Sequence, residues 1–417
     1  MPFPAMLRVR QRFDAPRVGD VAAGVRRALA ALPLAARIQP GQSVAITAGS
    51  RGIADLALVT RSAVEALREL GARPFIVPAM GSHGGGTATG QSAILAGFGI
   101  TEAGVGAPIR ASMDVVRLGS TADGVPVWFD REAAEADHVL VVNRVKPHTT
   151  FSAAIESGLT KMLVIGLGKQ RGAAAYHQAI AAHSFSRVLS TAAEVVLARA
   201  SILAGLAIVE NACEEIALLE AVAPAAFRER EPALLTLARQ WMPALPVARA
   251  DLLIVDAMGK NVSGSGMDTN VIGRKPEGNG AGPRIRRVFV RELTPETHGN
   301  AYGVGFADFT TIRLVRDMDY AATRLNCLTA AHPEAGAIPL HFESDREAIE
   351  TALASVGCET PARAHVLRIR NTLALGEVEV SEALRPELRA SGDVEIVGEP
   401  RTLAFDDAGN LRPFGHG

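Results

Sequence analysis

The chain contains little lysine and little cysteine, and it has no long run of apolar residues. Only five of its 43 lysine and arginine residues are lysine. Its three cysteines, Cys213, Cys327 and Cys358, are far apart and odd in number, which argues against a disulfide framework and a zinc site and indicates core thiols of a reducing compartment. No apolar run approaches the roughly 20 residues of a membrane-spanning helix. These shortages predict a cytoplasmic protein without a membrane partner.

Charge and composition are those of an ordinary globular protein and do not indicate nucleic acid as a partner. The formal net charge of −1 gives no electrostatic reason to expect nucleic acid as a partner. Two prolines and an arginine interrupt residues 1–8, which is unlike a signal peptide. With 48% hydrophobic and 21% charged residues, the 417-residue chain has the composition of an ordinary globular protein and the length of two domains.

The order of the expected elements indicates an α/β fold. Strand and helix patterns alternate in the first half, which implies a parallel sheet covered on both faces. The expected strands there are 43–47, 74–78, 139–142, 162–165 and 202–209, and the expected helices are 55–70, 89–97 and 172–197. A helical stretch with prolines covers 214–246. The second half has expected strands at 251–255, 288–291, 365–369 and 394–397 and helices at 312–331 and 345–355.

We therefore predict two α/β domains with parallel-type sheets and an active-site cleft between them. The first covers residues 1–248, and a smaller second domain covers 249–417 and closes the cleft. The last residues of the chain are free to pack back on the first domain.

The five lysines fall in two short windows of the sequence. They are Lys146, Lys161 and Lys169 in the first window and Lys260 and Lys275 in the second. In a chain that uses arginine as its routine cation, a retained lysine indicates a role that a guanidinium cannot fill, because an amine can lose its proton and form covalent bonds. The first window also holds His148 and His177.

Polar loops follow several expected strands, and the carboxyl ends of such strands are where open α/β folds bind ligands. Arg51, whose planar fork suits a carboxylate, follows strand 43–47, and His83 lies in a glycine-rich loop after strand 74–78. In the second domain, Lys260 and Arg274 follow strand 251–255. Each residue alone is compatible with a solvated loop, whereas the whole set favours a ligand site.

The motifs of the first domain resemble the nickel-pincer nucleotide family, which comprises lactate racemase and related 2-hydroxy-acid racemases and epimerases. Ser50-Arg51 resembles its Thr-Asp-x-Thr-Arg-Pro loop, Gly81-Ser82-His83 its Gly-Thr-His loop, and Pro147-His148 its Pro-His segment. Ser157-Gly158-Leu-Thr-Lys161 resembles its Ser-Gly-Gly-x-Lys motif, and His177 follows sixteen residues later, as the family's nickel ligand does. The resemblance covers about residues 40–210.

The resemblance implies a role for each matched residue. Lys161, in the motif with Ser157 and Gly158, would carry the nickel-pincer nucleotide through a thioamide, and His177 would be the single protein ligand of nickel. His83 and His148 would be the two acid/base groups of an isomerase, and Arg51 would hold the carboxylate of a small 2-hydroxy acid. Cofactor-making proteins would be required as partners.

The sequence also departs from the family pattern. Ala48 stands where the first loop has aspartate, Gly52 replaces its proline, and additional residues lie between His148 and Lys161. The family's Gln-x-x-Lys substrate clamp is absent, and we expect Lys260 and Arg274 to bind substrate in its place. The sequence leaves three matters open: a metal-independent carboxylate or sugar-acid lyase or hydrolase, a non-catalytic cofactor or nickel carrier, and homo-oligomerisation.

Overall fold

The computed structural model describes residues 3–13, 16–180, 182–277, 282–358 and 360–414. The chain forms two compact units. The N-terminal unit contains Ala15–His148 and Ala153–Met242, and the C-terminal unit contains Met1–Asp14, Thr149–Ser152 and Pro243–Gly417. The start of the chain thus belongs with its second half, whereas the sequence suggested a first domain beginning at residue 1.

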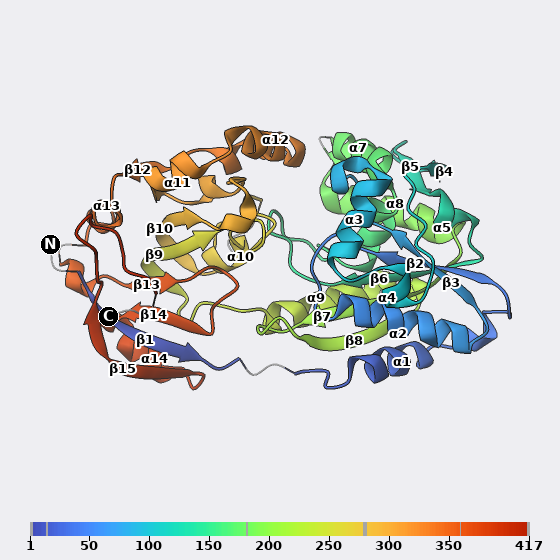
Figure 1. Ribbon diagram of the computed structural model, residues 1–417, viewed down its shortest axis with the longest axis horizontal. Coiled ribbons are helices and arrows are strands. Elements are labelled where there is room, and N and C mark those ends of the chain that lie inside the picture. Colours follow the sequence, from blue (N-terminus) through green and yellow to red (C-terminus); the bar gives the residue numbers. More distant parts are fainter. Residues whose placement is uncertain (1–2, 14–15, 181, 278–281, 359, 415–417) are drawn as a thin grey trace. The chain divides into compact units, whose positions relative to one another are not determined.

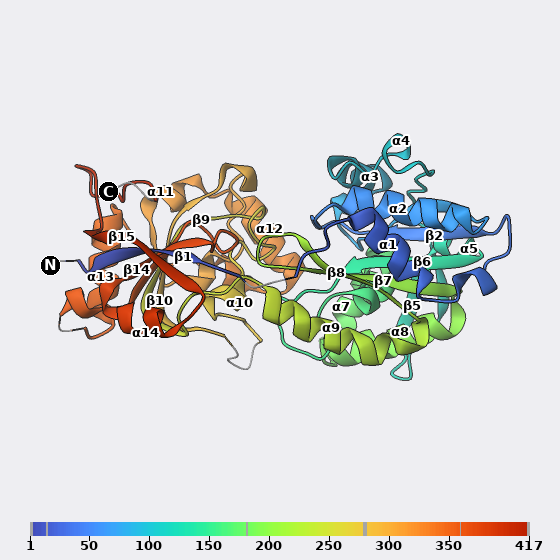
Figure 2. The ribbon, with the colours of Figure 1, turned by 90° about the horizontal axis from the view of Figure 1, so that it is seen from below.

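The N-terminal unit is built on a five-stranded, mostly parallel sheet with helices on both faces (Figures 1 and 2). Its strands, in spatial order, are β3 (Arg73–Pro78), β2 (Ser43–Ala48), β6 (His138–Arg144), β7 (Ile202–Glu210) and β8 (Ile216–Val222). Only β8 runs antiparallel to its neighbour. The expected α/β class with parallel strands is confirmed for this unit.

Two apolar cores cover the two faces of this sheet. Val44 and Ile46 pack in one core with α1 (Val21–Ala30) and α2 (Leu56–Glu69). Ala45 packs in the other core, which includes side chains of α8 (Phe185–Arg199) and α9 (Phe227–Trp241). Because successive side chains of a strand point to opposite faces, a sheet covered on both sides needs the continuous apolar runs seen in the sequence.

Two predictions of secondary structure in this unit are wrong. Residues 162–165, expected as a strand, are helical: α6 (Leu159–Lys161) leads into a π-helical turn (Met162–Gly166) and then α7 (Lys169–Ile180). The run is buried almost throughout, and a short run buried on every side has the same pattern in a helix as in a strand. The stretch 214–246, expected as helical, begins with strand β8 before α9.

The remaining elements of the unit are short. They are α3 (Ala88–Gly97), α4 (Glu102–Val105), α5 (Arg131–Glu135) and the hairpin of β4 (Val115–Ser120) and β5 (Pro126–Asp130). The sequence predicted α3 and did not predict the hairpin.

The C-terminal unit contains an eight-stranded mixed sheet (Figure 1). Its spatial order is β12 (Leu340–Phe342), β11 (Phe309–Thr311), β10 (Arg284–Leu293), β9 (Arg249–Met258), β13 (Val366–Ile369), β14 (Glu377–Ser381), β1 (Ala5–Gln11) and β15 (Val394–Thr402). The first five strands are parallel, and the last three are antiparallel. Strand β1 lies between β14 and β15, which explains why the first residues join this unit.

Five helices accompany this sheet. They are α10 (Thr269–Ile272), α11 (Ile312–Asp317), α12 (Tyr320–Ala330), α13 (Asp345–Ser355) and α14 (Arg385–Ala390). Ala348, Ile349 and Ala352 of α13 pack against strand residues Leu252 and Ile254.

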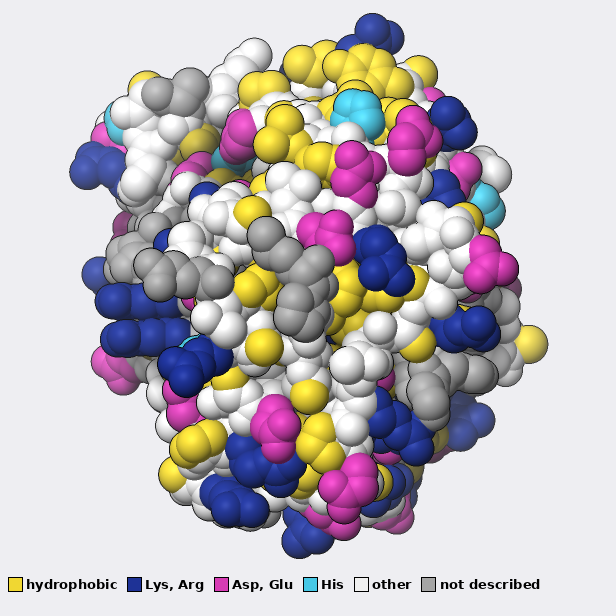
Figure 3. Space-filling model, turned by 90° about the vertical axis from the view of Figure 1, so that its left-hand side faces the viewer, with side chains coloured by type: hydrophobic (Ala, Val, Ile, Leu, Met, Phe, Trp, Pro, Cys, Tyr) yellow, Lys and Arg dark blue, Asp and Glu magenta, His cyan; other side chains and the backbone are white. Residues whose placement is uncertain are grey.

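Three expectations from the sequence concern membrane-spanning helices, surface charge and the burial of the cysteines. No helix among the described residues is long and apolar enough to cross a membrane. On the face shown in Figure 3, basic and acidic side chains are interspersed, as the near-zero net charge suggests. All three cysteines are free, but only Cys327 is buried; Cys358 is half-buried and Cys213 is exposed. The interpretation as core thiols is therefore right for Cys327 alone.

A buried ion-pair network joins strands and helices of the C-terminal unit. The carboxylate of Asp345, at the start of α13 and fully buried, contacts Arg291 Nε at 2.9 Å and the Arg313 guanidinium at 2.8 Å. Its Oδ2 also accepts a hydrogen bond from the backbone amide of Leu411 at 2.8 Å. Asp345 therefore binds a strand, a helix and the C-terminal segment together.

We predict that Asp345→Ala destabilises the C-terminal unit by about 3–5 kcal/mol, because it leaves the nearly buried Arg291 without one of its carboxylates. Denaturant unfolding, monitored through hydrogen exchange of the β9 and β10 amides, measures this loss of stability. As a matched control, Glu194→Ala breaks an exposed ion pair with Arg228 and should leave the unfolding midpoint nearly unchanged. Equal midpoints for the two variants would contradict the role given to Asp345.

Candidate functional site

The predicted site residues of the N-terminal unit follow three adjacent parallel strands. Arg51 comes after β2, His83 after β3 and His148 after β6, and these strands are neighbours in the order β3-β2-β6. Because the carboxyl ends of parallel strands meet at one edge, the three loops share that edge of the sheet.

The first two loops touch through Ser50 and His83. The hydroxyl of Ser50 forms a short hydrogen bond with Nδ1 of His83, whose side chain is exposed. Three successive glycines, 84–86, follow with φ between 64° and 68°, a region that residues with a Cβ rarely adopt. The glycines thus let the chain turn sharply after His83.

Phe185 links the predicted acid/base residue His148 to the predicted tether Lys161. The ring of Phe185, at the start of α8, stacks on His148 with centroids 6.3 Å apart and planes at 28°. Nζ of Lys161 lies 5.7 Å from the centroid of the same ring. His148 and Lys161 therefore flank one aromatic side chain.

A buried carboxylate, Glu156, fixes the backbone around His148. Its Oε2 accepts a hydrogen bond from the backbone amide of His148 at 2.6 Å, and its Oε1 accepts one from Ala153 at 2.9 Å. Arg239 of α9 donates to the same carboxylate at 2.6 Å. Between these residues, Thr149–Ser152 departs into the C-terminal unit, where the amide of Glu277 donates to the carbonyl of Thr150 at 2.8 Å.

The amine of Lys161 has an unusual electrostatic environment. Burial of the amine and the positive charge of Arg51 lower the pKa of Lys161 to about 8, while the negative charge of Glu156 opposes the shift. At pH 7 about a tenth of such an amine is neutral, against far less than a hundredth for an ordinary lysine with a pKa near 10.4. Lys161 is thus prepared to act as a nucleophile or to be acylated.

His177 lies within electrostatic reach of Lys161. Although the residue as a whole is exposed, desolvation of its imidazole and the charge of Lys161 lower the pKa of His177 and favour the neutral ring that binds metals. The chain between them is helical and contains a break at Lys169, whose φ of 53° turns the backbone before α7. The expected strand is therefore replaced by a helix, a turn and a second helix.

A buried acid, Glu231 of α9, supports the turn that carries Lys161. Its carboxylate accepts hydrogen bonds from the backbone amide of Thr160 at 3.1 and 3.2 Å and from the hydroxyl of the same residue. Gly158 precedes with φ 141°, and a Cβ there would lie 2.2 Å from Oε1 of Glu231. Burial raises the pKa of Glu231 to about 7, and the hydrogen bonds to Thr160 oppose this rise.

The predicted cofactor-motif residues Ser157 and Gly158 both have structural contacts. The hydroxyl of Ser157 accepts from the amide of Lys146 at 3.1 Å and donates to its carbonyl at 2.6 Å. The carbonyl of Gly158 accepts a hydrogen bond from the side chain of Asn143 at 2.8 Å. This motif therefore fastens the Lys161 turn to the end of β6.

Arg51 adds positive charge near Lys161. Although its side chain is largely exposed, desolvation of the guanidinium and the charge of Arg144 lower its pKa. Because an arginine starts from a pKa above 12, it still stays charged at neutral pH. An anionic group is the natural ligand for this arrangement.

The predicted substrate residues Lys260 and Arg274 belong to the C-terminal unit, where both have partners. Nζ of Lys260 donates to the carbonyl of Gly264 at 2.6 Å and lies 4.5 Å from the ring centroid of Tyr302. Arg274 forms an ion pair of 2.6 Å with Asp308, and the same carboxylate accepts from the amide of Val288 at 2.7 Å. Arg274 thus has a structural role that the sequence did not indicate.

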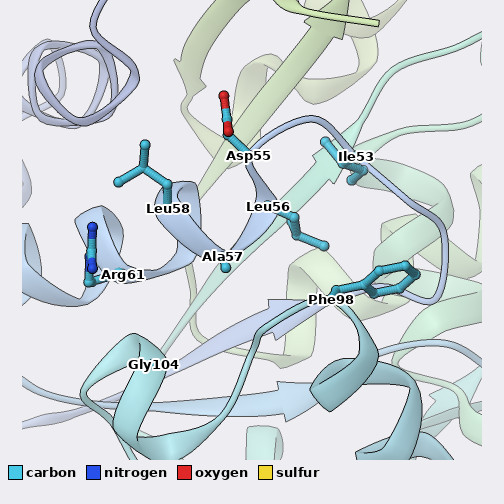
Figure 4. A pocket seen from close by; sticks show the side chains of 8 residues that line it. All are labelled: Ile53, Asp55, Leu56, Ala57, Leu58, Arg61, Phe98 and Gly104. Carbon is cyan, nitrogen blue, oxygen red and sulfur yellow. The ribbon is translucent and has the colours of Figure 1, made fainter.

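Two further features complete the description. Among the residues that the structure describes, no group of three or more His, Cys, Asp or Glu side chains is placed to hold a metal ion. A hollow of about 410 Å³ lies at the start of α2, lined mainly by apolar side chains with Asp55 and Arg61 (Figure 4). None of the predicted site residues lines it.

Sequence reasoning missed Ser50 as a partner of His83, and it missed Glu156, Phe185 and Glu231 altogether. Each acts on a residue that is distant in the sequence or on another element. Glu231 precedes a proline in a charged helix, a pattern that is typical of a solvated helix start. No local signal distinguishes it from its neighbours.

Comparisons with known proteins relate the chain to lactate racemase. Residues 5–188 match the model of the lactate racemase N-terminal domain. Among solved structures, the lactate racemase apoprotein from Thermoanaerobacterium thermosaccharolyticum has the same fold, with a TM-score of 0.56 and 14% sequence identity over 89% of this chain and 99% of that one. No curated protein matches the sequence. Residues 5–188 therefore resemble the lactate racemase N-terminal domain, and the chain shares the fold of lactate racemase.

Proposed function

We propose that the protein inverts C2 of a 2-hydroxy acid and that it does so with a nickel-pincer nucleotide attached to Lys161. The family and the fold support a racemase-type isomerase in general. The observation that carries the finer proposal is that Arg51, His83 and His148 follow adjacent parallel strands and that Lys161 lies beside the Phe185 ring on which His148 stacks. The lowered pKa values of Lys161 and His177 support it.

These two residues fit a group that brings most of its own metal donors. A self-contained metal site needs several side chains, whereas here a single imidazole, that of His177, would be offered beside the Lys161 amine, whose charge it feels. One histidine completes a square-planar Ni(II) site if the nucleotide supplies three donors. When bound, the group supplies a temporary hydride acceptor, so that no free nicotinamide is consumed.

The side chains of this protein would bind the substrate and move its protons. Arg51 would hold the carboxylate through charged hydrogen bonds. A different histidine would serve each enantiomer: it would take the hydroxyl proton when that enantiomer reacts and give a proton back to the C2 oxygen when that enantiomer is formed from the planar 2-keto acid. His83, held by Ser50, and His148, held through its backbone by Glu156, come from different loops, as two opposed poses require.

Lys161 of the unmodified protein should react with amine reagents at lower pH than the other four lysines. Because only the neutral amine reacts, its labelling should rise through pH 8 rather than near 10.4. Competitive acetylation read by peptide mass spectrometry measures the midpoint. Arg51→Ala removes a positive charge and should move the midpoint upward; a midpoint at the ordinary value for Lys161 would contradict the electrostatic account.

Lys161→Arg should abolish both the covalent adduct and nickel binding in protein produced together with cofactor-making enzymes, because a guanidinium keeps the charge but cannot form the tether. His177→Ala should keep the adduct and lose nickel. Intact mass and metal analysis measure the two properties separately. The matched control is Lys275→Arg, a lysine exchange outside the site, which should keep both, and a nickel-bearing, active Lys161→Arg protein would refute the proposal.

His83→Asn and His148→Asn should each lower the rate by about 10²–10⁴-fold, the usual contribution of a positioned acid or base. The equilibrium constant between enantiomers is one, so kcat/KM cannot differ between them. The two variants should instead differ in single-turnover formation of the 2-keto acid. His83→Asn should be slow with one enantiomer, and His148→Asn should be slow with the other. His341→Asn, in β12, is the control, and undiminished keto-acid formation from both enantiomers in either site variant would exclude that histidine.

A further inference from the structure

Lys169, the third lysine of the first window, has no part in the proposed reaction, yet it is fully buried. Its Nζ lies 2.8 Å from Oδ2 of Asp130, and neither side chain is exposed. The amine also donates to the carbonyl of Pro78, at the end of β3. Removing two charges from water to form a buried ion pair costs free energy. We therefore expect a structural role for this pair beside the loop of His83.

The same amine orients a buried amide, that of Gln91 in α3. Nζ of Lys169 lies 3.5 Å from Oε1 of Gln91, whose side chain has no exposed surface. Nε2 of Gln91 donates to the carbonyls of Gly81 at 3.0 Å and His83 at 3.2 Å. An ammonium can only donate and a carbonyl can only accept, so these partners fix which end of the amide faces which group.

Backbone hydrogen bonds, such as that from the Gly81 amide to the carbonyl of Gly166 at 3.2 Å, also hold the loop around His83. Its three successive glycines offer no side chain to hold it, and glycine loses more backbone entropy on ordering than any other residue. The loop lies directly on the backbone of α3: a Cβ on Gly90 would lie 2.0 Å from the carbonyl oxygen of Gly84. The amide of Gln91 is thus the side chain that ties both ends of the segment from Gly81 to His83.

We propose that Gln91 is a positioning residue for His83, with its amide held by the Lys169–Asp130 ion pair and fixing the loop that places the imidazole against Ser50. This inference rests on the proposed function, in which His83 serves one enantiomer. A displacement of about 1 Å of an acid/base group can cost up to about 10²-fold in rate. The Gln91 side chain is hydrogen-bonded to Gly81, His83 and Lys169, so its replacement should act first on His83.

Gln91→Met tests this in the loaded enzyme, because methionine fills the space and makes neither hydrogen bond. It should slow single-turnover keto-acid formation by about 10–10²-fold from the same enantiomer that His83→Asn slows, and leave the other within about threefold. The Lys161 adduct and the nickel content should stay at wild-type levels. Gln91→Glu keeps an acceptor for Lys169 and serves as the second variant if Gln91→Met fails to fold.

The matched control is Gln170→Met, which changes an exposed glutamine that packs beneath Gly86 of the same loop. Gln170→Met should leave the rate of single-turnover keto-acid formation unchanged for both enantiomers. An equal loss with both enantiomers, or a loss of nickel in a Gln91 variant, would overturn the proposal and show a general structural role.

Hydrogen exchange of the peptide covering residues 79–87 separates this inference from the proposed function. Gln91→Met should speed exchange there and leave the peptide around Lys161 unchanged, whether or not the wild type acts on any 2-hydroxy acid. If the wild type is inactive but the loop exchanges faster, the proposed function fails and the anchoring stands. Unchanged exchange of the loop would overturn the anchoring itself.

Discussion

The site depends on how one short turn, from Gly158 to Lys161, is held in the apolar interior. The amide and hydroxyl of Thr160 bind the buried carboxylate of Glu231, and the carbonyl of Gly158 binds Asn143 at the end of β6. An unpaired amide or carboxylate at this depth would cost about 1–3 kcal/mol or more, so each group requires the other. The turn fixes the direction of Lys161, and the low polarity around its amine is the main cause of its lowered pKa.

The surrounding charges explain why a lysine and not an arginine suits this position. Arg51 raises the local positive potential, and burial penalises any further cation, so an amine that can become neutral is favoured. Desolvation and the charge of Lys161 likewise favour the neutral ring of His177. Both pKa shifts favour the neutral forms that the proposed tether and the proposed nickel ligand would need.

The parallel sheet of the N-terminal unit was predictable because strands β2, β3, β6 and β7 are continuous apolar runs followed by polar loops. The region 162–165 was not, since a buried run of four residues has no period that separates helix from strand. Strand β1 was missed because its partners, β14 and β15, lie roughly 370 to 400 residues away in the sequence. Long-range pairing of this kind leaves no local pattern.

The site, like the fold, has residues that the sequence predicts and residues that it does not. Arg51, His83, His148, Lys161 and His177 stand in recognisable motifs, whereas Phe185, Glu156 and Gln91 are recognisable only by what they touch. Phe185 lies between His148 and Lys161 because α8 begins there, and nothing in the sequence around it indicates an aromatic contact.

X-ray absorption spectroscopy at the nickel edge, on wild-type protein produced with cofactor-making enzymes, tests the central claim most directly. The account predicts a four-coordinate, planar nickel with a single imidazole ligand, in protein whose peptide map shows the added mass on Lys161. Nickel bound by two or more imidazoles, or nickel held by protein with an unmodified Lys161, would contradict it.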